Sequence, residues 1–475
     1  MIKESVEWYV RVVQGSHAYI FKHSLQPCIT DKKRIVIKKH CSLFRGPPKV
    51  TSVGKVFLGD SMSKLETVTS ESVGLSSAQL EKIPEFFQKN YIDTGLIAGC
   101  ITAVIRRGKI AHISVLGKAD VERDVDMTEE SIFRLYSMTK PITSVALMSL
   151  YEDGAFQLTD PVSKFIPSWK DLEVYVSGTY PDFETKPVDR EMTVQDLLTH
   201  QSGLTYGFFA GFDPNATALA HAYKEHDLGM TDVFPPTLED LVDELAKLPL
   251  EFSPGTAWNY SVSTDVCARL VEILSGIPFD QFLKENIFSP LGMHETSYEV
   301  REDLMPRFTV NYLANMGDGL NVYDDPQTSR YRGPVTHFGG GVGLTAPLAD
   351  YIQFVKMLMN WGELDGQRIL GPRTLEFMTR NHLPNDVDIA DHAFGLPDAW
   401  PTGSGFGLGF GVTTDAVGTG VIGSEGTYNW GGAASTVFWV DPVEDLGVVY
   451  LTQSMLAALP ITGDLKALIY PAIIA

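Results

Sequence analysis

The stretch that comprises residues 133–154, FRLYSMTKPITSVALMSLYEDG, carries the strongest structural and chemical signal in the chain. It contains Ser137 and Lys140 in the pattern Ser-x-x-Lys. Residues three apart share one face of a helix, so this spacing places the Lys140 ammonium group beside the Ser137 hydroxyl. A serine hydroxyl is a weak nucleophile at neutral pH and needs an adjacent base. The two residues are therefore a candidate nucleophile and base.

The Ser-x-x-Lys pattern alone is a weak signal, because it also occurs twice within the polar residues 52–64. Only at residues 137–140 does a helical stripe follow it. The stripe consists of Ile142, Val145, Ala146, Ser149 and Leu150. Pro141 is compatible with this helix, because a proline is tolerated in the first turn. The context therefore favours Ser137 and Lys140 over the two other pairs.

Two further motifs have the residue types that acyl chemistry needs. Tyr260 ends a Pro/Gly-containing loop in residues 251–276, EFSPGTAWNYSVSTDVCARLVEILSG, just before a helical pattern. A tyrosine beside a Ser/Lys pair can carry protons. The segment NWGGAAS, residues 429–435, leads into a strand pattern, and Gly431 and Gly432 let the backbone approach a ligand closely. A free N–H at that turn could bind an oxyanion.

Taken in order, these motifs resemble those of the serine β-lactamase-like superfamily, in which Ser-x-x-Lys carries the nucleophile. The resemblance covers about residues 74–455 and includes three further phrases. These are LTDP at 158–161, TVQDLLTHQSGL at 193–204 and FSPLGM at 288–293. Within the superfamily the chain is most similar to class C β-lactamases, family VIII carboxylesterases and fungal-type acyltransferases.

The resemblance implies an α/β (α+β) fold of the β-lactamase and penicillin-binding-protein type. In that fold an antiparallel sheet is flanked by helices and joined to a mostly helical subdomain. The residue pattern is consistent with it, because strand patterns at 99–116 and beyond 405 enclose a helix-rich middle. We expect a serine hydrolase domain at 62–475, with its α/β part at 62–154 and 336–475 and its helical part at 155–335.

The resemblance also implies a role for each motif. Ser137 is the nucleophile, Lys140 is its base partner and Tyr260 is the proton shuttle. The backbone N–H groups of Ser137 and Ala433 form the oxyanion hole. The residues expected to contact substrate are Trp430, Gly431, Gly432, Tyr206 and Trp258.

Two departures from the β-lactamase pattern narrow the substrate class. β-Lactamases and D,D-peptidases commonly have an asparagine two residues after the motif tyrosine, where this chain has Val262. Their third motif usually starts with a cation, where this chain has Trp430. Without that cation a charge-assisted bond to a substrate carboxylate is lost. We therefore expect a carboxylic ester hydrolase that cleaves neutral short- to medium-chain acyl esters through an acyl-Ser137 intermediate.

Three alternatives remain open from the residues. The same Ser/Lys/Tyr set could serve a β-lactamase or D,D-peptidase, an acyltransferase, or a non-catalytic ligand-binding relative. No cofactor and no metal are expected. The four cysteines are too few and too scattered for a disulfide scaffold or a zinc site. They are Cys28, Cys41, Cys100 and Cys267.

Composition sets the remaining expectations. The chain has 475 residues, of which 44% are hydrophobic and 20% charged, as in a globular protein. Its net charge of −21 argues against nucleic-acid binding. No apolar run reaches the roughly 18 residues that a membrane span requires. The first residues lack the order of a secretory signal, so we expect a cytoplasmic protein that acts on a small-molecule ester.

The charge is unevenly distributed along the chain. Residues 1–60 contain 11 Lys and Arg against 4 Asp and Glu, although the whole chain is acidic. Such a basic arm can meet an acidic partner or a membrane surface, but charge runs are more often solvated. We expect residues 1–61 to be an extension outside the catalytic domain, either a disordered arm or upstream sequence foreign to the native protein. Met62 would then be an ordinary start.

Overall fold

The computed structural model divides into two units, Met1–Leu65 and Glu66–Ala475, which are described separately. It describes residues 7–14, 17–24, 65–213, 215–229, 235–315, 319–394, 401–455 and 457–474. In the first unit, β1 (Glu7–Gln14) and β2 (His17–Ser24) form an antiparallel pair. The predictions of a disordered arm and of a start at Met62 otherwise lie outside the described residues.

A protein that begins at Met62 is expected to keep the activity and melting temperature of the full chain. The reason is that the second unit begins only at Glu66 and has its own hydrophobic core. Thermal unfolding and enzymatic assays of the two proteins, side by side, test this expectation. A lower melting temperature in the shorter protein would show that residues before Met62 stabilise the catalytic unit.

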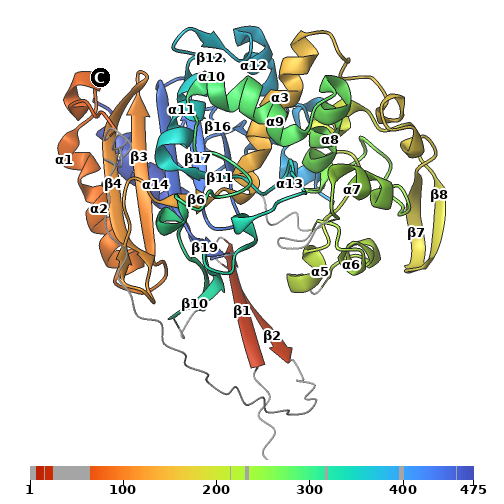
Figure 1. The fold of residues 1–475 in the computed structure, drawn as a ribbon, viewed down its shortest axis with the longest axis horizontal. Helices are drawn as coiled ribbons and strands as arrows, with labels where there is room; N and C mark the ends of the chain where they lie inside the picture. The colour runs from red at the N-terminus through yellow and green to blue at the C-terminus, as the bar shows by residue number, and fades with distance from the viewer. Residues whose placement is uncertain are drawn as a thin grey trace, which may run out of the picture. The chain divides into compact units, whose positions relative to one another are not determined.

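An eight-stranded antiparallel sheet forms the frame of the second unit (Figure 1). Its order is β14 (Ser404–Phe406), β15 (Gly411–Thr413), β16 (Tyr428–Gly431), β17 (Val437–Asp441), β18 (Leu446–Thr452), β3 (Gly99–Arg106), β4 (Lys109–Asp120) and β5 (Val125–Asp126). The hairpin expected at 99–116 is confirmed as β3 and β4. All eight residues of β3 are buried, because β4 and β18 flank it on its two edges.

One strand prediction at the C-terminal end is wrong. The pattern of residues 406–412 predicts a single strand, but this segment contains the end of β14, a turn and the start of β15, which is antiparallel to β14. The chain reverses at Gly409, whose φ of 90° is in the region that favours glycine. A Cβ at Gly409 would collide with the Ser144 side chain. This close approach brings the turn against the helix that follows Ser137.

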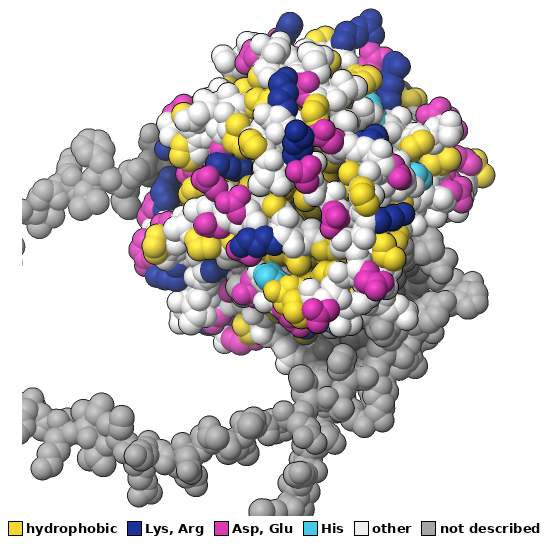
Figure 2. Space-filling view, turned by 90° about the vertical axis from the view of Figure 1, so that its right-hand side faces the viewer, with side chains coloured by type: hydrophobic (Ala, Val, Ile, Leu, Met, Phe, Trp, Pro, Cys, Tyr) yellow, Lys and Arg dark blue, Asp and Glu magenta, His cyan; other side chains and the backbone are white. Residues whose placement is uncertain are grey.

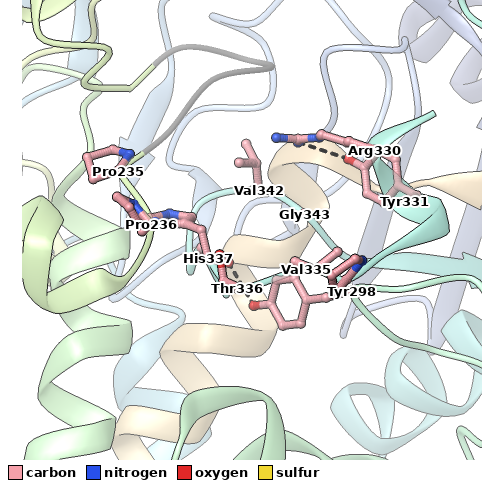
Figure 3. A pocket seen from close by; sticks show the side chains of 12 residues that line it. Pro235, Pro236, Tyr298, Arg330, Tyr331, Val335, Thr336, His337, Val342 and Gly343 are labelled. Atoms are coloured by element: carbon pink, nitrogen blue, oxygen red, sulfur yellow. Dashed lines mark hydrogen bonds between the residues drawn. The ribbon is translucent and has the colours of Figure 1, made fainter. Parts of the chain in front are cut away.

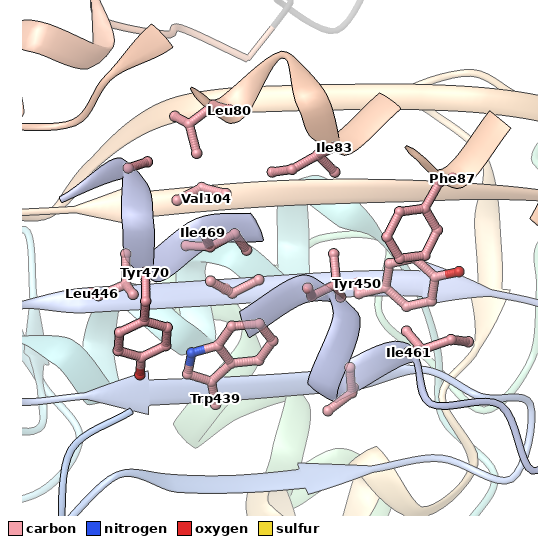
Figure 4. Close-up of a cluster of buried hydrophobic side chains, with 14 of the residues drawn as sticks. Leu80, Ile83, Phe87, Val104, Trp439, Leu446, Tyr450, Ile461, Ile469 and Tyr470 are labelled. Carbon is pink, nitrogen blue, oxygen red and sulfur yellow. The ribbon is translucent and has the colours of Figure 1, made fainter. Parts of the chain in front are cut away.

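Three helices cover one face of the sheet (Figure 4). They are α1 (Ser77–Leu80), α2 (Lys82–Phe87) and α14 (Ile461–Ile469). Their buried side chains meet those of β3, β17 and β18, and the cluster includes Leu80, Ile83, Phe87, Val104, Trp439, Tyr450 and Ile469. The sequence predicts a helix that Ser76 or Ser77 caps and that runs to about Asn90. In the structure Ser76 is the cap and accepts the Gln79 N–H, but the helix is interrupted at Glu81 and ends in a π-turn, Gln88–Ile92.

The opposite face of the sheet is covered by α11 (Leu348–Met359). Val355 and Met359 press against Gly447 of β18, where a Cβ would have no room. The next layer begins with α3 (Thr139–Glu152), which packs against α8 (Ser263–Ser275) (Figure 1). Eleven of the fourteen α3 residues are buried. This burial explains why α3 carries an apolar pattern wider than a single stripe.

The segment predicted as mostly helical, residues 155–335, also contains strands. Its helices are α4 (Val194–Leu198), α5 (Phe209–Phe212), α6 (Ala218–Glu225), α7 (Leu238–Leu245), α8, α9 (Phe279–Leu283) and α10 (Ser289–Leu291). The hairpin of β7 (Glu173–Thr179) and β8 (Asp182–Pro187) precedes these helices, and the pair β9 (Asn311–Asn315) and β10 (Gly319–Asp324) follows them. β9 also pairs in parallel with β19 (Ser454–Met455), so this segment joins the C-terminal part.

The surface of this helical region carries both signs of charge. On the face shown in Figure 2, acidic and basic side chains are interspersed between apolar ones. The structure contains no helix with the length and apolar character of a bilayer span in the part of the chain that it describes.

Candidate active site

Ser137 lies on a 3₁₀ turn, Tyr136–Met138, between the short strand β6 (Ile132–Arg134) and α3. Tyr136 has a φ of 46°, a left-handed conformation that costs a non-glycine residue roughly 1–3 kcal/mol. Its surroundings impose this conformation. Tyr136 is buried, and its hydroxyl accepts a 2.7 Å hydrogen bond from Asn311 Nδ2. The strained turn thus fixes the half-buried Ser137 at the start of a buried helix.

Lys140 reaches Ser137 from the first turn of α3. Its Nζ lies 3.3 Å from Ser137 Oγ and donates a 2.8 Å hydrogen bond to the Gly341 carbonyl. The ammonium group also lies over the ring of Tyr260, 4.7 Å from its centroid, and 5.3 Å from that of Tyr206. Lys140 is only 2% exposed, so Ser137 lies between the ammonium group and solvent-accessible space.

Tyr260 completes the group from the loop that precedes α8. Its hydroxyl donates a 2.7 Å hydrogen bond to Ser137 Oγ. The Tyr260 ring packs against the rings of His200, Tyr206, Trp258 and Trp430, whose centroids lie 5.0, 5.3, 6.4 and 5.5 Å away. This packing holds Tyr260 next to Ser137, although the two residues are 123 positions apart in the chain.

His200 supports Tyr260 by packing against its ring. Its Nδ1 lies 3.2 Å from Ser261 Oγ, and its own carbonyl accepts the Asn259 N–H at 2.8 Å. Burial and the nearby Lys140 charge lower the pKa of His200 well below its ordinary value. The imidazole is therefore neutral at physiological pH.

The backbone turn between β16 and β17 lies against the nucleophile. Ala433 packs on Tyr136, the residue before Ser137. Gly432 donates a 2.8 Å hydrogen bond to the Thr436 carbonyl and closes the turn. Among the described residues, no group accepts the Ala433 N–H. The turn is partly exposed, so this N–H is placed to bind the oxygen of an acyl group on Ser137.

Gly432→Ala is expected to lower kcat by about 10²-fold or more, the usual effect of losing one oxyanion donor. A Cβ at Gly432 would overlap the Leu135 carbonyl and Thr436 Oγ1, so the turn must move. Gly463→Ala on α14 is the matched control, because a Cβ there meets nothing within 4 Å. Kinetics and thermal unfolding of both variants would separate the two effects. An unchanged kcat in Gly432→Ala would remove this turn from the mechanism.

Tyr206 and Trp258, both expected to contact substrate, are buried at 3% and 1% exposure. The Tyr206 ring lies against Tyr260, with centroids 5.3 Å apart, and on its other side against Phe208, at 4.8 Å. Both rings pack against Tyr260, and Trp258 also packs against His200 and Phe406. Substrate contact by these two residues, and by Trp430, Gly431 and Gly432, stays a prediction.

Asp265 and Gly341, which have no role among the sequence predictions, lie next to Lys140 in the structure. Asp265, in the first turn of α8, is 2% exposed, and its Oδ1 accepts the Gly341 N–H at 2.9 Å. Burial raises the pKa of Asp265, and the Lys140 charge opposes this rise. The available signals were the acidic residue five positions after Tyr260 and the glycine run at 339–341.

The loop that contains Gly341 also lines a pocket (Figure 3). The Tyr298 hydroxyl donates a 2.7 Å hydrogen bond to the Gly339 carbonyl at its base. Burial lowers the pKa of His337 to about 4, so its imidazole is neutral there. The lining residues are Pro235, Pro236, Tyr298, Arg330, Tyr331, Pro334, Val335, Thr336, His337, Gly339, Val342 and Gly343.

The geometry suits nucleophilic acyl chemistry. Two groups that can take a proton lie within 3.3 Å of Ser137 Oγ, and the Ala433 N–H lies on the adjoining turn. Residues 87–468 match the family model described as Beta-lactamase. The chain belongs to the beta-lactamase family. Its fold, with a helix-flanked antiparallel sheet and a helical region, is that of β-lactamases and penicillin-binding proteins.

Several known proteins resemble this chain over most of their own length. Protein Rv1367c of Mycobacterium tuberculosis is 33% identical over 76% of this chain and 87% of its own. Lovastatin esterase of Penicillium rubens is 30% identical over 79% of this chain and 93% of its own. The structure of EstCE1, a hydrolase with promiscuous acyltransferase activity, superposes with a TM-score of 0.69. It covers 83% of this chain and 99% of EstCE1 at 23% identity.

Proposed function

We propose that this protein is a serine esterase that hydrolyses short- to medium-chain acyl esters through a covalent acyl-Ser137 intermediate. The observation that carries the proposal is the simultaneous approach of Lys140 Nζ and Tyr260 OH to Ser137 Oγ, at 3.3 and 2.7 Å. The chain is 30% identical to lovastatin esterase over 93% of that protein's length, and this similarity supports the assignment of an esterase activity. A beta-lactamase family member with an intact Ser/Lys/Tyr group has the parts that acyl transfer requires.

The reaction has two steps that use the same residues. Ser137 loses its proton to the Lys140–Tyr260 pair while Oγ bonds to the ester carbonyl carbon. The Ala433 and Ser137 N–H groups hold the negative oxygen, and the departing alkoxide takes the proton from the pair. Water then gives a proton to the pair and attacks the acyl carbon. The acid leaves, and the pair returns the proton to Ser137.

The surroundings of Trp430 favour neutral esters. Trp430 occupies the place at which lactam-cleaving and peptide-cleaving relatives usually carry a cation. It packs on Tyr260 and on Phe406, with a 5.3 Å centroid distance to the latter. An aromatic surface offers contact to an apolar acyl or alkoxy group and no charge for a carboxylate.

The test is a comparison of three reactions of the wild-type protein. We expect turnover of p-nitrophenyl butyrate, and kcat/KM for a chromogenic cephalosporin at least about 100-fold lower, the effect of one missing charge-assisted contact. Equal turnover of the cephalosporin would identify a β-lactamase instead. Addition of a primary alcohol tests acyl transfer, because a transferase would yield more new ester than free butyrate.

A further inference from the structure

Asp265 is a buried acidic residue that the proposed reaction does not use. It is 2% exposed and projects from the first turn of α8 toward the loop of Gly341. Its partners in this direction are backbone N–H groups, with Gly341 N at 2.9 Å. A carboxylate in such a place is costly unless a positive charge lies near it.

The nearest cation is Lys140, and Gly341 separates the two side chains. A Cβ built on Gly341 would lie 2.7 Å from Asp265 Oδ2, 3.1 Å from Lys140 Nζ and 3.0 Å from the Tyr206 hydroxyl. Three polar atoms therefore surround the position that a side chain of residue 341 would occupy. Because both lie so near this point, the carboxylate and the ammonium group are within about 6 Å of each other, near enough for strong coupling.

Gly341 also connects the two charges through its own backbone. Its N–H donates to Asp265, and its carbonyl accepts from Lys140 at 2.8 Å. The direct contact of Lys140 is thus a neutral carbonyl, and the balancing negative charge lies one residue deeper. The Lys140 ammonium group therefore contacts the Gly341 carbonyl on one side and Ser137 Oγ on another.

We propose that Asp265 is a positioning residue whose buried negative charge sets the pH range in which Ser137 is nucleophilic. The proposal rests on the esterase mechanism above. The hydrogen bonds of Asp265 lead to backbone N–H groups of the Gly341 loop, so Asp265 acts on Ser137 through Lys140 and Tyr260. A negative charge favours the protonated form of every acid near it, so Asp265 favours retention of protons by the Lys140–Tyr260 pair.

The direction of the effect does not depend on which member of the pair is the base. A negative charge opposes removal of a proton from any group near it, and both candidate bases lie on the same side of Gly341 as Ser137. In both cases removal of the negative charge moves the acidic limb of the activity profile toward lower pH.

Other titratable groups face this cluster, and they remain unchanged in the test. They are Tyr206 and His200 from the loop after α4, Cys267 on α8, Tyr298, and His337 on the Gly341 loop. Burial lowers the pKa of both histidines and raises the pKa of Cys267 and of both tyrosines. All five are therefore neutral near pH 7 and do not supply the balancing charge.

Asp265→Asn is the decisive variant, because the amide has the shape of the carboxylate and can still accept the Gly341 N–H. We expect the acidic limb of kcat/KM for p-nitrophenyl butyrate to move about one pH unit toward acid. The labelling rate of Ser137 by a fluorophosphonate should show the same displacement. An acidic limb within about 0.2 pH units of wild type would overturn the proposal.

Asp350→Asn is the matched control. Asp350 is also buried in the first turn of a helix, α11, where its carboxylate accepts the Glu295 and Thr296 N–H groups. It should lose stability and keep the wild-type pH profile. An equal shift in this control would show a general effect of buried carboxylates and also overturn the proposal.

Two additions keep the outcome unambiguous. Asp265→Ser, a smaller neutral replacement, takes over if thermal unfolding shows that the asparagine variant is not folded. The fluorophosphonate separates the two proposals, because it reports Ser137 nucleophilicity without ester turnover. Labelling without ester hydrolysis would count against the esterase proposal alone. Labelling with an unchanged pH profile in the neutral variants would count against the role of Asp265.

Discussion

Replacing Ser137 by alanine is expected to lower kcat/KM for p-nitrophenyl butyrate by about 10⁴-fold or more. Loss of a catalytic serine removes the covalent route entirely, and only the weaker contribution of binding and oxyanion stabilisation remains. Ser137 Oγ is the atom that both Lys140 and Tyr260 approach, so no other hydroxyl inherits their bonds. Steady-state kinetics measure the loss, and mass spectrometry should show no fluorophosphonate adduct.

Ser149→Ala is the control for this experiment, because Ser149 lies on the same helix and its hydroxyl donates only to the Ala146 carbonyl. It should have wild-type kinetics. Equal activity in Ser137→Ala and the wild type would remove Ser137 from the mechanism. Activity lost in both variants would indicate damage to α3 and would leave the nucleophile to be found by adduct mapping.

Tyr260→Phe is expected to lower kcat by about 10³-fold, within the range found for loss of a general acid–base group. The substitution removes the hydroxyl 2.7 Å from Ser137 Oγ and keeps the ring that packs on His200 and Trp430. The effect should therefore fall on kcat, with the melting temperature almost unchanged. Stopped-flow detection of p-nitrophenol would show whether acylation or deacylation is slowed.

Tyr470→Phe makes the same chemical change at a remote place. The Tyr470 hydroxyl donates a 2.7 Å hydrogen bond to Asp441 in the core on the far face of the sheet. This control should lose about 1 kcal/mol of stability, the usual value of one hydrogen bond, with little change in kcat. If Tyr260→Phe kept kcat within threefold of wild type, Lys140 alone would have to carry the proton.

Local spacing was sufficient to bring Ser137 and Lys140 together from the sequence, because the 3₁₀ turn that contains Ser137 runs directly into α3, which begins at Thr139. Tyr260 required the resemblance to a family, since 123 residues separate it from Ser137. The structure now supplies the link: His200, Trp258 and Trp430 hold the Tyr260 ring in place.

The parts that could not be predicted depend on contacts between distant segments. The position of Asp265 against Lys140 depends on Gly341, which comes 76 residues later and fits only because it lacks a side chain. The break in residues 406–412 depends on the close approach of Gly409 to α3. Strand β9 lies within the predicted helical part because β19, far along the chain, pairs with it.

The position of β3 between β4 and β18 has a consequence for biosynthesis. Arg106 pairs with Leu446, so the inner edge of this fully buried strand finds its partner about 340 residues later. At translation rates of 5–20 residues per second, the ribosome needs tens of seconds to deliver β18. During that interval the β3–β4 hairpin carries an apolar, unpaired edge, which is the kind of surface that chaperones shield. Expression with slowed elongation should therefore favour inclusion bodies, and the yield should depend on chaperone supply.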